Sequence, residues 1–292
     1  MQKIVPFLWF DGQAEEAVRL YTSLFRDSAV RSTGRYGDAG PGPNGSVMMQ
    51  SFHLAGRELT ALNGGPQFHF TPAVSFFVSC ASEPEIDSLW RGLSSGGQVR
   101  MELARYPFSQ KFGWVTDRYG LSWQLTLSGG ETRVAPFFFF VGAQAGKAEE
   151  AMKAWTSLFP DSAIRQVERY PAGRGETEGA VMHARFALAG QEFMAMESSR
   201  EHAFTFTPAL SMFVNCETQD EVDRLWESVS AGGEKGQCGW VTDRYGVSWQ
   251  IVPTVLGTLL GDPDRAKASR VMKAMLGMRK LDIRALQAAR DS

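Results

Sequence analysis

Apolar and polar positions along this chain alternate in a way that predicts short strands and single amphipathic helices. Ile4–Phe10 is an almost continuous apolar run that ends at Asp11-Gly12, which is typical of a strand covered on both faces. Over Ala14–Phe25 the apolar residues recur at helical spacing, so this segment predicts a helix with one stripe packed on a sheet. Three further strands are predicted at Ala29–Tyr36, Val47–Leu54 and Glu58–Asn63. The opening of the chain therefore predicts a β-α-β-β-β module.

The same module is predicted again directly downstream. It begins after the turn at Gly64–Pro66, and Gly96-Gly97 end its helix. Its elements are a strand at Val74–Cys80, a helix at Glu85–Leu93 and strands at Val99–Ala104, Phe112–Thr116 and Leu121–Leu127. The first half of the chain therefore contains two modules.

This two-module pattern occurs twice. GWVTDRYGLSWQL at Gly113–Leu125 returns as GWVTDRYGVSWQI at Gly239–Ile251, and VPFLWF at Val5–Phe10 is answered by APFFFF at Ala135–Phe140. Because order and spacing are kept, the repeat spans a whole folding unit and indicates duplication followed by fusion. The second copy is shorter at 234–237, where we expect its last module to lack a full strand.

Length and repeat together predict two domains, 1–130 and 131–254, and a helical tail over 255–292. The tail carries a Met-rich apolar stripe, which is most often core packing and only occasionally a partner-binding face. With 30 Lys+Arg against 32 Asp+Glu and no block of like charge, we expect a small-molecule ligand, and neither nucleic acid nor a membrane as partner. Three cysteines, which cannot all pair, predict reduced thiols in a cytoplasmic protein.

Paired β-α-β-β-β modules, the opening PFLWFDG and AEEAVRLYTSLF, and the closing GWVTDRYGLSWQL resemble the PhnB-like family, often labelled 3-demethylubiquinone-9 3-methyltransferase. The tail sequence VMKAMLGMRKLDIRAL, at Val271–Leu286, is also similar to that family's C-terminal signature. The family lies in the vicinal-oxygen-chelate superfamily of glyoxalases, bleomycin-resistance proteins and extradiol dioxygenases. This resemblance implies an α+β fold in which two modules curl into a cupped mixed sheet around a pocket. The tandem copies would form an internal pseudo-dimer, in a monomer or a homodimer.

The resemblance also implies where a divalent metal would sit, and the residues at those positions are poor ligands. The first-strand position falls near Pro6 and Pro136, neither of which can bind a metal. Each copy then offers two candidates at most, Asn63 with Gln124 and Glu197 with Gln250. Because a transition-metal site needs three or more N, O or S ligands, we expect no catalytic metal and no cofactor.

Seven residues are candidates for lining a ligand pocket: Asn63, Trp114, Gln124, His183, Glu197, Trp240 and Gln250. The two glutamines alternate with tryptophans on a strand, so they either face the cup as hydrogen-bonding groups or close a buried backbone gap. The tryptophans Trp114 and Trp240 pack or stack on a ligand, and we favour packing. Asp117 and Asp243 are interpreted as turn residues. The second copy, with His183 and Glu197, is the more polar and is the expected site.

Three functions remain open at this level. The first is a binding protein of the bleomycin-resistance type, which holds a small, partly apolar molecule and needs no metal. The second is an enzyme of the same superfamily, a lyase, a dioxygenase or the labelled methyltransferase, with Glu197 as base. The methyltransferase label lacks a Gly-rich turn for a nucleotide-like donor, because the segment 37–43 contains two prolines. The third is a structural or interaction module.

Overall fold

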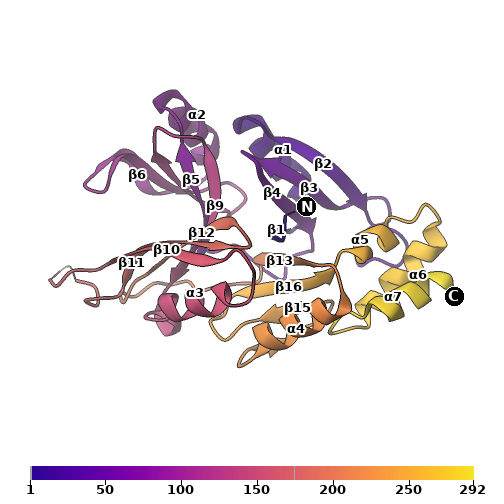
Figure 1. The fold of residues 1–292 in the computed structure, drawn as a ribbon. Helices are drawn as coiled ribbons and strands as arrows, with labels where there is room; N and C mark the ends of the chain where they lie inside the picture. The colour runs from indigo at the N-terminus through magenta and orange to yellow at the C-terminus, as the bar shows by residue number, and fades with distance from the viewer. Residues whose placement is uncertain (1, 174) are drawn as a thin grey trace.

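The computed structural model describes residues 2–173 and 175–292, which form four β-α-β-β-β modules followed by a helical tail (Figure 1). Module 1 comprises β1 (Ile4–Phe10), α1 (Ala14–Leu24), β2 (Ala29–Arg35), β3 (Val47–Leu54) and β4 (Arg57–Asn63). Module 2 comprises β5 (Val74–Cys80), α2 (Glu83–Ser94), β6 (Gln98–Tyr106), β7 (Ser109–Thr116) and β8 (Ser122–Leu127). These bounds lie within a few residues of those that the hydrophobic pattern predicts.

The second copy repeats this order with two changes, a short turn after its first strand and a shortened hairpin. Module 3 comprises β9 (Arg133–Phe140), the 3-10 turn η1 (Gly142–Gln144), α3 (Ala148–Thr156), β10 (Ala163–Arg169), β11 (Val181–Leu188) and β12 (Gln191–Glu197). Module 4 comprises β13 (Leu210–Cys216), α4 (Gln219–Ser230), β14 (Glu234–Lys235), β15 (Trp240–Thr242) and β16 (Ser248–Pro253). The tail forms α5 (Val255–Leu260), α6 (Arg265–Leu276) and α7 (Ile283–Asp291). The prediction that the last module lacks a full strand is confirmed, since β14 has two residues.

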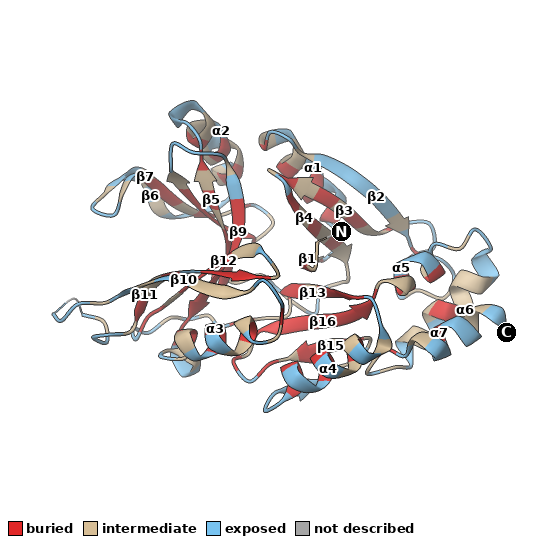
Figure 2. Cartoon of the chain, viewed as in Figure 1, coloured by how far each residue is buried: buried red, intermediate tan, exposed pale blue. Residues whose placement is uncertain are grey.

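Two eight-stranded mixed sheets carry the fold. Sheet A has the order β14-β15-β16-β13-β1-β4-β3-β2, and sheet B has the order β10-β11-β12-β9-β5-β8-β7-β6. At the centre of each sheet two modules meet through an antiparallel pair, β1 with β13 in sheet A and β5 with β9 in sheet B. Figure 2 shows that these central strands are the buried part of the molecule, while β2 at the edge of sheet A is exposed.

The α+β class with tandem modules and a helical tail is confirmed, but each sheet is shared between the two copies. Module 1 pairs with module 4 and module 2 with module 3, whereas we expected the two modules of one copy to curl into one sheet. The linkers 64–73 and 198–209 each connect a module in one sheet to a module in the other sheet. The two linkers also contact each other reciprocally. Thr71 Oγ1 donates to the carbonyl oxygen of Thr205, and Thr207 Oγ1 donates to that of His69, both at 2.7 Å.

Modules of the same copy meet instead through the helix-bearing faces of their sheets. In α1 the residues Ala14, Ala17, Val18 and Tyr21 are buried at helical spacing, and they belong to one continuous apolar core with residues of module 2. The opposite face of each sheet lies away from α1–α4, and we call it the hollow of that sheet. In Figure 1 the ribbons of sheets A and B lie to opposite sides of the central strands, and α5 lies beside the strands of sheet A.

The helical tail packs on the hollow of sheet A. Leu256, Leu259 and Leu281 are buried in a cluster with Val252 of β16, and Phe213 of β13 packs against it. The tail also bonds to the shortened hairpin of module 4. The N–H of Cys238 donates to the carbonyl oxygen of Met278, and the N–H of Gly239 to that of Arg279, both at 2.7 Å. These tail residues therefore lie beside the β14–β15 hairpin, which in module 2 is the long β6–β7 hairpin.

Within the described residues no helix has both the length and the apolar character that crossing a membrane requires.

Candidate functional site

Gln124 and Gln250 face the hollows of the two sheets and are tied down there. Gln124 Nε2 donates to Ser75 Oγ at 2.9 Å, and Gln250 Nε2 donates to Ser211 Oγ at 3.0 Å. All four side chains are buried, with Gln124 5% and Gln250 4% exposed. Each glutamine therefore faces the hollow and satisfies the hydroxyl group of a serine on the neighbouring parallel strand, instead of closing a gap in the backbone.

Asn63 and Glu197 lie on the helix-facing side, not in a hollow. Asn63 Oδ1 accepts from the N–H of Ala14 at 2.8 Å, where α1 begins. The two carboxylate oxygens of Glu197 accept from the N–H groups of Ala148, where α3 begins, at 3.2 Å and of Val181 at 2.6 Å. Both side chains thus join the end of a strand to the start of a helix, where an acceptor is favoured by the unpaired N–H groups.

The two tryptophans face opposite hollows and both are half-buried. Trp114 Nε1 donates to Ser122 Oγ at 2.8 Å, and its ring lies 6.1 Å from that of Phe139. Trp240 lies 6.2 Å from Phe7 and edge-on to it, and it also contacts Trp9 and Phe68. Packing against the aromatic lining is the role that these contacts give both side chains.

His183 of β11 is the predicted residue that lines an open cavity. Its ring lies 6.1 Å from Phe77 and 6.2 Å from Phe137, two aromatic residues at the centre of the hollow of sheet B. Burial lowers the pKa of His183, and Glu168 offsets this in part. The imidazole is therefore neutral at neutral pH and can both donate and accept a hydrogen bond.

The cavity lies in the hollow of sheet B and has a volume of about 250 Å³. It is built by both copies, because β5 and β8 belong to the first and β9, β11 and β12 to the second. Apolar side chains, Phe77, Ala135 and Met194 among them, provide part of its wall. The polar side chains around it are Ser79, Thr126, Ser128, Arg133, His183, Arg185 and Glu192. That the second copy holds the site stays a prediction; its polar residues His183, Arg185 and Glu192 line a cavity that the first copy completes.

The equivalent place in sheet A is taken by the tail. Phe213 and Val252 stand in the repeat where Phe77 and Thr126 line the cavity of sheet B, and both contact the cluster formed by α5–α7. Valine in place of threonine gives the tail an apolar surface, and burying the leucines of the tail against this surface is favourable. The two hollows thus differ: one is covered by the chain itself and the other remains open.

The residues of both hollows do not fit a metal centre of the kind that the superfamily resemblance implies. Pro6 and Pro136 lack donor atoms, Asn63 and Glu197 point to the helix side, and the two glutamines are bonded to serines. In the part of the chain that the structure describes, no group of three or more His, Cys, Asp or Glu side chains is placed to hold a metal ion. A transition-metal site of that kind needs three or more N, O or S ligands from the protein, so we derive no metal-dependent step.

The repeated GWVTDRYG phrase contains a buried carboxylate that sequence reasoning missed. Asp117 is 3% exposed, and its Oδ2 accepts from Tyr21 Oη at 2.7 Å and from Trp123 Nε1 at 2.8 Å. Its Oδ1 accepts from the N–H groups of Tyr119 and Leu121, as expected of a turn residue. Burial raises the pKa of Asp117, and these four hydrogen bonds offset part of the increase.

Asp243 repeats this arrangement in the second copy. Its Oδ2 accepts from Trp155 Nε1 at 2.8 Å and from Trp249 Nε1 at 2.9 Å. Trp155 stands where the first copy has Tyr21, so the residue changes while the donor is kept. That exchange is a signal in the sequence that could have identified the aspartate as an acceptor. The phrase therefore joins the helix of one module to the last hairpin of the next.

Comparison with known proteins agrees with this architecture. A family model described as 3-demethylubiquinone-9 3-methyltransferase matches residues 2–126 and again residues 132–252. The chain belongs to this family. Among solved structures, a PhnB protein from Bacillus cereus that bears the same methyltransferase name is 48% identical, covering 44% of this chain and 100% of its own, with a TM-score of 0.42. No curated protein matches the chain.

Two larger structures resemble the chain over most of its length. A glyoxalase I variant from Zea mays has a TM-score of 0.56 at 10% identity, covering 86% of this chain and 94% of its own. A Bacillus subtilis protein named as a dioxygenase has a TM-score of 0.50 at 9% identity, covering 95% of this chain and 91% of its own. At such identities the likeness shows the fold alone, and the chemistry of family members does not carry over.

Proposed function

We propose that this protein binds one small, partly apolar molecule in the hollow of sheet B, without a catalytic metal. The observation that carries the proposal is the difference between two hollows of common origin. The hollow of sheet A is covered by α5–α7, and the hollow of sheet B keeps a cavity of about 250 Å³. A concave site with apolar walls and a few polar groups is the usual form of a small-molecule site.

The protein works in this proposal as an internal pseudo-dimer of the segments 1–130 and 131–254, with the tail 255–292 as a cover. The cavity needs residues of both segments, so neither copy alone would form it. The tail in turn gives a reason why duplicated sequence yields a single site.

The enzymatic alternative rests on Glu197 as base, and the contacts of that residue do not favour it. Both carboxylate oxygens accept main-chain hydrogen bonds on the helix-facing side, away from the cavity. A base would instead have to be His183, which lines the cavity.

A thermal-shift screen with flat aromatic compounds tests the proposal on the intact chain. Compounds that bind should raise the melting temperature, because a ligand of the native state stabilises it by mass action. Ala135→Phe places a ring in the cavity and should abolish these shifts, while Ala143→Phe on the exposed η1 turn should retain them. Shifts that persist in Ala135→Phe would place the ligand elsewhere.

Metal analysis of the purified protein is the second test. We expect no stoichiometric Ni, Zn, Mn or Fe, and the ligand-induced shifts should survive dialysis against a chelator. One metal ion per chain that is needed for binding would contradict the proposal.

A further inference from the structure

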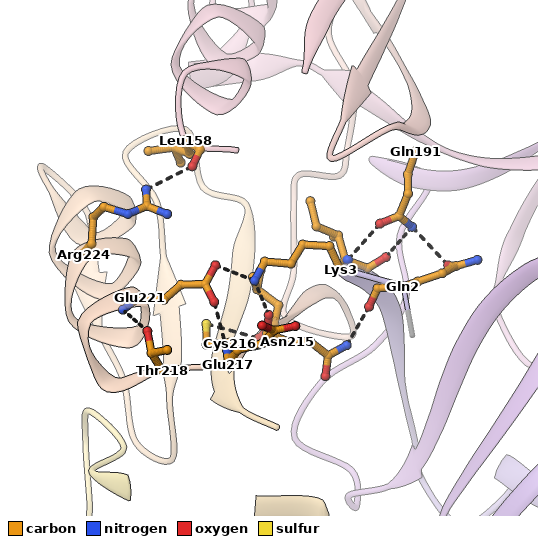
Figure 3. A network of polar contacts seen from close by, with 12 residues as sticks. Gln2, Lys3, Leu158, Gln191, Asn215, Cys216, Glu217, Thr218, Glu221 and Arg224 are labelled. Carbon is orange, nitrogen blue, oxygen red and sulfur yellow. Dashed lines mark hydrogen bonds and ion pairs between the residues drawn. The ribbon is translucent and has the colours of Figure 1, made fainter. Parts of the chain in front are cut away.

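The first strands of the two copies begin with equivalent cations that have different surroundings, Lys3 in sheet A and Arg133 in sheet B. Figure 3 shows Lys3 inside a network, where its Nζ donates to Glu221 Oε1 and to the carbonyl oxygen of Asn215, both at 2.5 Å. The side chain of Lys3 is 23% exposed. Its charge is therefore neutralised within the protein.

Arg133 has lost the equivalent partner. Glu85 stands in the repeat where sheet A has Glu221, and it accepts from Thr132 Oγ1 at 2.7 Å and from the N–H of Ala81 at 2.8 Å. Arg133 pairs with Glu131 at 3.4 Å, and the two side chains are 62% and 86% exposed. Because such exposed pairs contribute little, the guanidinium of Arg133 is available to the cavity that it lines.

A second guanidinium lines the same cavity in a fixed orientation. Arg185 of β11 donates from Nε and Nη2 to Glu192 Oε1, which orients its planar group. Behind them Arg57 is 7% exposed and donates to the carbonyl oxygens of Val134 and Glu192. Glu192 thus stands close to two guanidinium groups.

Positive charge exceeds negative charge at this end of the cavity. Burial lowers the pKa of Arg57 to about 10, so the side chain remains charged at neutral pH. Glu131 and Glu168, the acids nearest to Arg133 and His183, are exposed, and solvent and salt screen their charges. Among the residues that line the cavity, Arg133 and Arg185 therefore stand against one carboxylate, that of Glu192.

A second pocket of about 520 Å³ adjoins the cavity, and both are lined by the segment 126–128. At its edge the tip of the β6–β7 hairpin presents Phe108, which is 67% exposed and stacks on Tyr106 with ring centroids 5.5 Å apart. Phe77 in the cavity lies 6.5 Å from Phe112, and Phe112 lies 5.2 Å from Phe108, so aromatic rings extend from the cavity to the tip of the hairpin. A flat aromatic body can follow this surface, since aromatic faces favour stacked or edge contacts.

We propose that the ligand of this cavity is a small organic carboxylate on a flat aromatic body, with the carboxylate bound by Arg133 and Arg185. The inference rests on the proposed function and adds the chemical class of the ligand. Guanidinium groups suit it because their fork matches a carboxylate in two hydrogen bonds.

A matched pair of probes separates the charge from the shape of the ligand. We would titrate the intact protein with 1-naphthylacetate and with neutral 1-naphthylacetamide by calorimetry. The acid should bind at least about tenfold more tightly, the factor that one charge-assisted hydrogen bond contributes. Arg133→Gln should lower the affinity for the acid by about tenfold and leave the affinity for the amide within about twofold. Arg31→Gln, which removes an exposed cation from β2 of sheet A, is the control and should change neither affinity.

The remaining outcomes distinguish this inference from the proposed function. Equal binding of acid and amide, with both lost in Ala135→Phe, would overturn the inferred preference for a carboxylate. The proposed binding site would still stand. An acid preference that Arg133→Gln does not reduce would overturn the role of Arg133. Binding of neither probe at up to about 10 mM would count against both proposals.

Discussion

Removing one hydroxyl group should reveal how much the buried aspartate of the repeated phrase stabilises the fold. Tyr21 of α1 is fully buried, and its Oη donates to Asp117 Oδ2 at 2.7 Å. The variant Tyr21→Phe keeps the ring and deletes this donor. Asp117 is then left with three donors in a buried site, so part of the cost of burying its charge is no longer offset.

We expect Tyr21→Phe to lower the free energy of unfolding by about 2 kcal/mol at neutral pH, the middle of the range for a hydrogen bond to a charged group. Tyr36→Phe is the matched control, because Tyr36 Oη donates to the neutral carbonyl oxygen of Asn63 at 2.6 Å. Its cost should be about 1 kcal/mol or less. Urea unfolding followed by tryptophan fluorescence measures both, and equal m-values would show that the same surface is exposed on unfolding.

The pH dependence of this difference provides a sharper test. Burial raises the pKa of Asp117 above its unfolded value, so the carboxyl group favours the folded state at low pH and this contribution is lost as pH rises through the folded pKa. Losing a donor raises the folded pKa further. The gap between Tyr21→Phe and the wild type should therefore be largest at neutral pH and shrink toward about pH 4. A cost below about 0.5 kcal/mol at neutral pH, or one that grows on acidification, would show that Tyr21 does not stabilise the charged form of Asp117.

Three further changes test other parts of the structure. Because burial lowers the pKa of His183, stability should fall as pH decreases from about 7.5 to about 5, and His183→Gln should flatten that fall in urea midpoints. Leu281→Ala in the tail should cost about 3 kcal/mol, since Leu281 is fully buried, while Leu276→Ala at a 43% exposed site should cost less than about 1 kcal/mol in the same unfolding assay. Glu197→Gln keeps one acceptor oxygen but sets an amide donor against the other main-chain N–H, so it should destabilise by about 2 kcal/mol and leave ligand affinity by calorimetry within about twofold. A large loss of affinity without destabilisation would restore this residue to the site.

The secondary structure could be predicted closely because each element carries its own signal. Ile4–Phe10, Val47–Leu54 and Val74–Cys80 are strands with the predicted bounds, each a compact apolar or alternating run between turn residues. The helices were equally readable from their 3.6-residue spacing. The truncated hairpin at 234–237 was visible as a deletion between the copies.

Strand pairing between modules could not be predicted in the same way. β1, β5, β9 and β13 are all apolar strands, so the pattern of apolar residues does not distinguish β13 from β5 as the neighbour of β1. The choice depends on contacts between distant linkers, such as Thr71 with Thr205, that no local pattern encodes.

The sequence also does not predict to which face of its strand each candidate side chain points. β12 is buried on both faces, so alternation shows that Glu197 and Met196 point opposite ways without showing which one enters the hollow. Asp117 was recognised correctly as a turn residue through Oδ1, but its Oδ2 contacts a tyrosine 96 positions earlier in the chain. Such pairings depend on the tertiary arrangement.

A crystal structure with 1-naphthylacetate bound would locate the ligand and its contacts. We expect density for one ligand per chain in the hollow of sheet B, with its ring against Phe77 and its carboxylate between Arg133 and Arg185, and α5 unmoved over the hollow of sheet A. Density in the hollow of sheet A after displacement of the tail, or on the helix-facing side beside Glu197, would contradict this expectation.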